Sequence, residues 1–257
     1  MVGGLGSFTI AVAQRVEESR RSPTTRPQVK VNTAGLSTDD LERLRRSEPS
    51  KRIPPRNRTK ADILVYPFHD TSLALKDYSA RPWLVRNTLG RYLVRRETAA
   101  YLAAGELDGL PRFLGRVNPF ALATAWIDAR PLAHCSEQEI PSGFFDDLHA
   151  LTERIHRRGI ALADLHHRDV LVGRTGSVHI VDLAASWTLG KRPGRLRRAI
   201  FERLCDQDRI AVARMRARFG DENERDAINA VGERAAARYR RARRLKAMFD
   251  RMRGRKG

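Results

Sequence analysis

Five charged residues occur in an order that suits phosphoryl transfer from ATP, namely Lys76, Glu97, Asp164, Asp169 and Asp182. Such a reaction depends mainly on positioning and on charge neutralisation. A lysine holds phosphate oxygens, a glutamate fixes that lysine, one carboxylate orients the attacking hydroxyl, and oxygen ligands suit Mg²⁺. We therefore predict that Asp164 is catalytic, that Lys76 and Glu97 serve ATP binding, and that Asp169 and Asp182 are metal ligands. The expected cofactors are ATP and Mg²⁺.

The letters HRD at positions 167–169 offer a second register, in which Asp169 is catalytic. HRD is the catalytic-loop signature of protein kinases, and a metal-binding amide follows five residues later. In that register the amide is replaced by Arg174, which would repel Mg²⁺, and only 13 residues separate Asp169 from Asp182. If Asp164 is catalytic, the fifth residue is Asp169, an oxygen ligand, and 18 residues precede Asp182. We interpret the HRD letters as a coincidence and favour Asp164.

The surrounding sequence predicts strands followed by helices. Alternating apolar residues predict strands, and the apolar face of Phe144, Leu148, Leu151 and Ile155 predicts an amphipathic helix that ends at Gly159. The expected strands are 63–68, 72–79, 111–115, 122–127, 170–172 and 177–183, and the expected helices are 38–46, 91–105, 144–158 and most of the chain after residue 191.

This order of elements predicts an α+β fold with two lobes. We expect a β-rich N-lobe over residues 61–128 and a helical C-lobe over residues 129–225. Residues 1–60 are rich in Pro, Ser and Arg, which predicts a basic, disordered N-terminal tail. Residues 226–257 are expected to form a basic helical C-terminal tail.

Three motifs carry a family resemblance. DLHHRDVLV (164–172) resembles the pattern D-[LI]-x-x-x-N-[IV]-L-[VI] of kinase-like enzymes, and WIDARPL (126–132) resembles their hinge. CDQDRIAVARMRARFG (205–220) resembles their C-terminal helix, in which Asp206 or Asp208 would be a structural aspartate. Residues 61–220 thus resemble the protein-kinase-like fold, and more specifically the bacterial lipopolysaccharide core kinases (Kdo and heptose kinases) and their RIO-type relatives.

The resemblance implies an ATP- and Mg²⁺-dependent phosphotransferase whose acceptor is a sugar hydroxyl of a glycolipid. A protein serine or threonine is the alternative acceptor. Four departures keep a pseudokinase as a further alternative. YPFHDTS (66–72) has no glycine where a Gly-rich loop would cover the phosphates, Asp169 replaces Asn, the DFG-like triplet at 182–184 lacks glycine, and Ala163 stands where sugar and antibiotic kinases usually have Gly.

The charge balance indicates an anionic partner. The chain has 49 Lys and Arg against 30 Asp and Glu, a net charge of +19. From Lys191 onward, 22 basic residues face 9 acidic ones, which supplies +13 of that charge. The basic C-terminus suits an anionic membrane surface, nucleic acid is the alternative partner, and a solvated helix is the simplest interpretation.

Cysteine content and apolar run length bear on location. Two cysteines cannot build a disulfide framework, which favours a reduced compartment. No run approaches the roughly 18–20 apolar residues of a membrane span. We expect a cytoplasmic protein, with peripheral association at the inner face of the cytoplasmic membrane.

Overall fold

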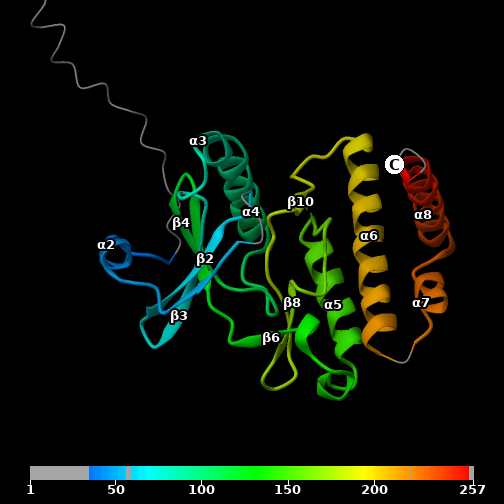
Figure 1. Ribbon diagram of the computed structural model, residues 1–257, viewed down its shortest axis with the longest axis horizontal. Helices are drawn as coiled ribbons and strands as arrows, with labels where there is room; N and C mark the ends of the chain where they lie inside the picture. The colour runs from blue at the N-terminus through cyan, green and yellow to red at the C-terminus, as the bar shows by residue number, and fades with distance from the viewer. Residues whose placement is uncertain (1–34, 56–58, 221, 255–257) are drawn as a thin grey trace, which may run out of the picture. The chain divides into compact units, whose positions relative to one another are not determined.

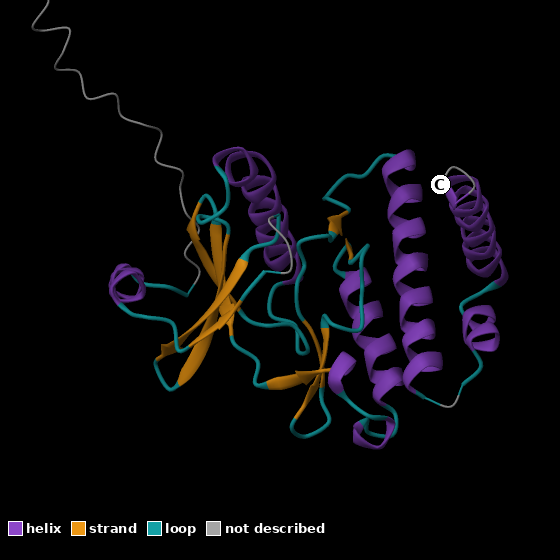
Figure 2. Cartoon of the chain, viewed as in Figure 1, coloured by secondary structure: helices purple, strands orange, loops and turns teal. Residues whose placement is uncertain are grey.

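The computed structural model describes residues 35–55, 59–220 and 222–254, which all lie within one compact unit, Asn32–Gly257. An antiparallel sheet dominates the N-terminal part of this unit, and helices dominate its C-terminal part (Figures 1 and 2). The α+β class with a β-rich first part and a helical second part, as predicted from the order of elements, is confirmed.

Five strands form the N-terminal sheet in the order β1-β2-β3-β5-β4, and all neighbours are antiparallel. Along β3, Leu73 and Leu75 are buried on one face, so Lys76 lies on the opposite face. The strands are β1 (Lys51–Ile53), β2 (Asp62–Phe68), β3 (Thr71–Asp77), β4 (Phe113–Asn118) and β5 (Ala121–Ala125).

The N-terminal sheet begins before residue 61, so the predicted tail over residues 1–60 is too long. Helix α2 (Thr38–Arg46) starts at the N-cap Ser37, whose hydroxyl accepts the backbone N–H of Asp40, so the helix expected over residues 38–46 is present. Leu36 is buried against residues of the sheet, and β1 pairs with β2. Apolar residues in this Arg-rich stretch are few, but those present pack against the sheet. The prediction for residues 1–34 lies outside the described residues.

The other face of the sheet packs against a helix that carries Glu97. The short helix α3 (Trp83–Val85) continues through the π-helical turn η1 (Arg86–Gly90) into α4 (Arg91–Ala104). A side chain at Gly90 would come within 2.9 Å of Tyr78, so the residue permits close packing on the end of β3. The helix predicted over 91–105 is confirmed, and it positions Glu97 toward Lys76.

The C-terminal part combines two long packed helices with short strands. Helices α5 and α6 lie side by side, and the sheet β6-β8-β9 and the pair β7–β10 lie at their N-lobe side (Figure 1). The elements are β6 (Ala129–Pro131), η2 (Leu132–His134), η3 (Glu137–Glu139), α5 (Phe144–Arg157), β7 (Ile160–Ala161), β8 (Val170–Gly173), β9 (Val178–Ile180), β10 (Trp187–Thr188), α6 (Arg195–Phe219), α7 (Glu224–Ala230) and α8 (Glu233–Gly254).

The expected boundary between the C-lobe and the basic tail, at residue 226, falls inside helix α7. Ala227 and Ile228 of α7 and Ala235 and Ala236 of α8 are buried in one cluster with residues of α6. The first part of the predicted tail is therefore packed onto the C-terminal lobe, because small apolar residues recur within its basic sequence.

Candidate active site

Lys76 joins the sheet, helix α4 and the segment after β9. Its Nζ atom lies 2.8 Å from Glu97 Oε2 and 2.6 Å from Asp182 Oδ1. The side chain of Glu97 is only 2% exposed, so Glu97 is not one of the exposed intrahelical ion pairs that the neighbouring arginines suggest. The structure thus brings together three of the five predicted site residues.

Electrostatics favour the charged forms of Lys76 and Asp182, whereas burial raises the pKa of Glu97 above its ordinary value and the charge of Lys76 opposes that rise. Burial opposes the charge of Lys76, but the carboxylates of Glu97 and Asp182 raise its pKa above the ordinary value. Burial likewise opposes the charge of Asp182, but the nearby ammonium of Lys76 lowers its pKa below the ordinary value. We infer that Lys76 is an ammonium and Asp182 a carboxylate at neutral pH.

Asp182 has an unusual backbone that aims its carboxylate at Lys76. Its φ is +73°, a left-handed conformation that costs a residue other than glycine about 1 kcal/mol. The backbone N–H of Ala184 donates to Asp182 Oδ1 at 3.0 Å, and the N–H of Leu183 donates to Glu97 Oε1 at 3.3 Å. These contacts fix the triplet 182–184 without the glycine that its sequence lacks.

Asp169 and Asp164 complete the set of five. Burial first, and then the charge of Asp182, raise the pKa of Asp169 to about 7. Asp164 raises that pKa further and Lys76 lowers it, so all four groups share one electrostatic environment. The backbone N–H of Val181 donates to the carbonyl of Asp169 at 2.8 Å, which ties this loop to the strand that leads to Asp182.

The loop that carries Asp164 is anchored from helix α6. The carboxylate of Asp208 accepts the backbone N–H groups of Leu162 and Ala163, each at 2.8 Å, and contacts His156 Nε2 at 2.9 Å. Asp208 is 1% exposed, whereas Asp164 is exposed. Of the two aspartates that the resemblance offered as structural, the geometry identifies Asp208; the other, Asp206, pairs with Arg209 and Arg238.

Arg96 contacts the segment after Asp182, and the sequence did not predict this contact. It donates from Nε to the carbonyl of Ser186 and from a terminal nitrogen to the carbonyl of Ala185, both at 2.5 Å. The next residue, Glu97, accepts the backbone N–H of Leu183, so two consecutive residues of α4 bind the backbone that follows Asp182. Sequence spacing gives no signal for a bond between an arginine and distant backbone carbonyls.

The turn at 66–72, which we assigned to the phosphate-covering loop, joins β2 to β3 rather than the first two strands of the sheet. Because β1 pairs with β2, the first hairpin of the sheet is residues 51–68, and residues 66–72 hold the next turn. Residues 54–61 read PPRNRTKA, basic and without glycine. Burial is the largest influence on the pKa values of Asp169 and Asp182, and the charge of Lys60 lowers both, so Lys60 lies near these two carboxylates. Lys60 was not among the predicted site residues, because the composition of residues 1–60 predicts a tail.

The donor set fits Mg²⁺ when a nucleotide supplies further oxygens. Among the described residues, no group of three or more His, Cys, Asp and Glu side chains is arranged to hold a metal ion. Asp169 and Asp182 offer two carboxylates, and Mg²⁺ commonly takes one or two carboxylates plus substrate phosphates. Burial first, and then the negative charges of Asp182 and Asp164, raise the pKa of Asp169, and a bound cation would relieve this repulsion between the carboxylates.

The elements around this site define a protein-kinase-like fold. The chain is similar to the solved structure of the Rio2 kinase from Chaetomium thermophilum, with a TM-score of 0.54 over 77% of this chain and 70% of that chain. The sequence identity is 16%, so the similarity shows the fold alone. The expected protein-kinase-like fold is confirmed, and the closer relation to lipopolysaccharide core kinases stays a prediction.

No protein-family model and no curated protein matches the chain. In the described part of the chain, no helix has the length and apolar character needed to cross a bilayer.

Proposed function

We propose that this chain is an ATP- and Mg²⁺-dependent phosphotransferase with an alcohol as acceptor. The observation that carries the proposal is the position of Lys76 Nζ, 2.8 Å from Glu97 and 2.6 Å from Asp182. An ammonium between a helix carboxylate and a carboxylate beside the catalytic loop is the arrangement that phosphate binding requires.

Each residue has one role in this proposal. Lys76 contacts the phosphates of ATP, and Glu97 positions Lys76. Asp164 accepts a hydrogen bond from the acceptor hydroxyl and takes its proton. The hydroxyl oxygen forms a bond to the γ-phosphorus while the bond from that phosphorus to the β–γ bridging oxygen breaks, which yields a phosphate ester and ADP. Asp169 and Asp182 would bind Mg²⁺, which would neutralise phosphate charge.

The acceptor that we propose is a sugar hydroxyl of a glycolipid, because the motifs at 126–132 and 164–172 resemble those of the lipopolysaccharide core kinases. A protein serine or threonine is the alternative. A pseudokinase that acts as a basic binding module is the second candidate function, and one observation favours it. Asp169 adds a carboxylate where an amide is usual, next to two other acidic groups.

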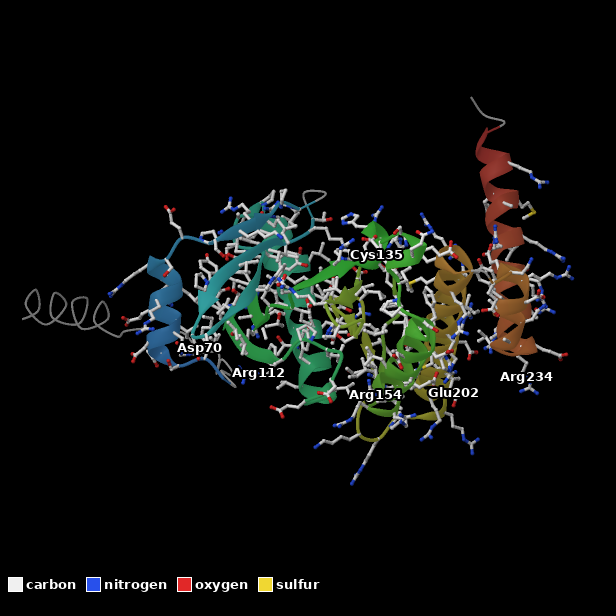
Figure 3. All side chains as sticks on the ribbon, turned by 90° about the horizontal axis from the view of Figure 1, so that it is seen from below. Asp70, Arg112, Cys135, Arg154, Glu202 and Arg234 are labelled. Carbon is white, nitrogen blue, oxygen red and sulfur yellow. The ribbon has the colours of Figure 1, made fainter. Side chains whose placement is uncertain are left out.

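The test is transfer of labelled γ-phosphate from Mg-ATP into a total cell extract, with glycolipid and protein fractions separated. Asp164→Ala should abolish transfer, and Asp70→Ala is the matched control, because Asp70 is exposed at the far turn of the sheet (Figure 3). Label in glycolipid that depends on Asp164 supports the proposal, and label in protein would indicate a serine/threonine kinase. Transfer that survives Asp164→Ala would overturn the catalytic assignment.

A further inference from the structure

Exposed apolar side chains are concentrated in three segments of the chain. Of the ten large hydrophobic side chains exposed in the described residues, nine lie within residues 83–92, 196–200 and 245–249, and Leu102 is the exception. Single exposed apolar residues are ordinary, whereas grouped ones mark interaction surfaces.

The three segments lie at one edge of the described unit. Figure 1 places α3 with the start of α4, the N-terminal end of α6 and the C-terminal end of α8 at the same upper edge. We call residues 83–95, 191–200 and 241–251 together the docking edge. Figure 3 shows the C-terminal part of α8 extending beyond α6, so that this end of the helix is not covered by its neighbour.

The C-terminal half of α8 is amphipathic and lacks packing. Leu245, Met248 and Phe249 follow the spacing i, i+3, i+4, which places them on one face, and they are 53%, 49% and 58% exposed. Every side chain described between Arg244 and Arg251 is exposed. Apolar residues repeated on one face of a helix are normally buried, so this face indicates a partner.

The segment 191–200 has cationic side chains beside its apolar residues. Leu196 is 76% exposed, and no acidic residue occurs between positions 183 and 201. Lys191, Arg192, Arg195 and Arg198 are exposed and form no ion pair with any residue that the structure describes.

The first turn of α6 is anchored to strand β10 and the residue after it through Arg197. The guanidinium of Arg197 lies 4.4 Å from the Trp187 ring centroid and donates to the carbonyls of Thr188 and Leu189. The cations of the segment are therefore presented by an anchored stretch of chain.

The segment 83–95 also combines apolar and basic side chains. Trp83 and Leu84 are 69% and 64% exposed, and Tyr92, the second residue of α4, is 57% exposed. Arg91 and Arg95 are exposed on the same helix. A surface that offers both aliphatic or aromatic groups and unpaired cations is complementary to the headgroup region of an anionic bilayer.

We propose that the docking edge binds the surface of an anionic phospholipid bilayer. The apolar side chains enter the boundary between headgroups and acyl chains, and the lysines and arginines contact lipid phosphates. Nucleic acid would use the same cations, but aliphatic residues such as Leu84, Leu196, Leu245 and Met248 gain nothing from stacking on bases.

The docking edge is connected to the candidate active site. Strand β10, which leads into the segment 191–200, pairs with β7, with Trp187 opposite Ala161 and Thr188 opposite Ile160. β7 leads directly into the loop of Asp164. Bilayer binding does not depend on catalysis; only the further consequence, that a lipid-borne acceptor meets Asp164, rests on the proposed function.

The experiment is flotation of the full chain with vesicles of phosphatidylcholine alone or mixed with phosphatidylglycerol. The wild type should float only with the mixed vesicles, and less so at about 1 M salt, where the Debye length is about 3 Å. The variant Leu245→Ser/Met248→Ser/Phe249→Ser should lose flotation. Each cation removed should weaken binding about fivefold, so Arg195→Gln/Arg198→Gln should weaken it about 25-fold.

Matched controls separate docking from general effects. Leu102→Ser removes a side chain as exposed as Met248, both 49%, outside the docking edge. Arg45→Gln/Arg46→Gln removes two exposed cations from α2. Both should float like the wild type, as should Asp164→Ala, so loss of phosphate transfer and loss of docking are distinguishable.

Three results would overturn the proposal. The first is anionic-vesicle binding that the triple serine variant retains in full. The second is an absence of flotation together with tight binding to a homopolymeric RNA. The third is an absence of flotation together with a dimer, seen by sedimentation velocity, that the triple variant converts to a monomer.

Discussion

The ammonium of Lys76 and the carboxylate of Glu97 form a buried ion pair between strand β3 and helix α4, with 2.8 Å between Nζ and Oε2 and exposed side-chain fractions of 14% and 2%. Removing one partner from a buried pair leaves the other charge desolvated and unpaired, which costs far more than the loss of a surface pair. Stability therefore reports on this pair even before any activity is measured.

Lys76→Met should lower the free energy of unfolding by about 3 kcal/mol, because the carboxylate of Glu97 would stay buried without its ammonium. Urea unfolding at neutral pH measures the change. The double variant Lys76→Met/Glu97→Leu should recover much of the loss, and Lys191→Met, at an exposed position, should be neutral. Equal stability of Lys76→Met and the wild type would show that the pair does not exist in solution.

Asp208→Asn should slow phosphate transfer without touching the substrate. The carboxylate accepts two backbone N–H groups, from Leu162 and Ala163, beside the loop of Asp164, and an amide offers only one accepting oxygen in its place. We expect a loss of about 2 kcal/mol in stability and a fall in kcat larger than any change in KM for ATP.

The control for this change is Asp206→Asn, two residues away on the same helix. Asp206 pairs with Arg209 and Arg238 near the surface, and such pairs contribute little. If both variants lost activity equally, Asp208 would have no special role in positioning the catalytic loop.

The sequence predicted those parts of the site whose residues are close in sequence or fixed by a repeated pattern. The sequence spacing of Asp164, Asp169 and Asp182 predicted that these three residues lie together. In the structure, the charges of Asp164 and Asp182 both act on Asp169. Alternation along β3 predicted a strand, and the structure shows that the same alternation puts Lys76 on the face opposite Leu73 and Leu75.

The parts that the sequence did not predict depend on contacts between distant segments. Composition alone assigned residues 35–55 to a tail, but β1 needs only three residues to pair with β2. That pairing brings Lys60 to the site. The bonds of Arg96 to Ala185 and Ser186 likewise join residues far apart in the chain, which no local periodicity encodes.

Ala163→Gly should stabilise the chain. Ala163 has φ of +65°, a left-handed conformation that costs a residue with a Cβ about 1–2 kcal/mol, whereas glycine adopts it without strain. The larger conformational entropy of glycine in the unfolded chain offsets part of this gain. We therefore expect the free energy of unfolding, measured in urea, to rise by about 0.5–1 kcal/mol. Ala161→Gly, in strand β7, is the control and should destabilise. A loss of stability in Ala163→Gly would contradict the backbone conformation.

Lys60→Ala should raise the KM for ATP several-fold and leave kcat nearly unchanged. Its charge acts on Asp169 and Asp182, which places it near the phosphate end of the site, in the connection that lacks glycine. A cation that contacts phosphate equally in the ground and transition states affects binding alone. Arg45→Ala, at an exposed position of α2, is the control. An unchanged KM for ATP would show that Lys60 does not contact the nucleotide.

Asp169 should give the metal-free chain a stability that falls as the pH rises. Its pKa is raised from 3.8 to about 7 in the folded chain, so the folded state keeps a proton that the unfolded state has lost between these values. The free energy of unfolding therefore decreases from about pH 4 to about pH 7, by on the order of 4 kcal/mol in total. Groups with lowered pKa values, such as Asp182, act in the opposite direction, so a single curve is not diagnostic.

The diagnostic quantity is the difference between Asp169→Asn and the wild type, measured by urea unfolding in EDTA at pH 5 and pH 8. Because the amide does not titrate, Asp169→Asn should gain stability over the wild type at the higher pH. The stability of Asp70→Asn, at an exposed turn, should change with pH as that of the wild type does. The amide also keeps an oxygen ligand, so Asp169→Asn should retain phosphate transfer and Asp169→Ala should lose it. Parallel stability curves for Asp169→Asn and the wild type would show that this carboxyl is neither desolvated by burial nor crowded by Asp182, and the metal-ligand assignment of the pair would lose its main physical support.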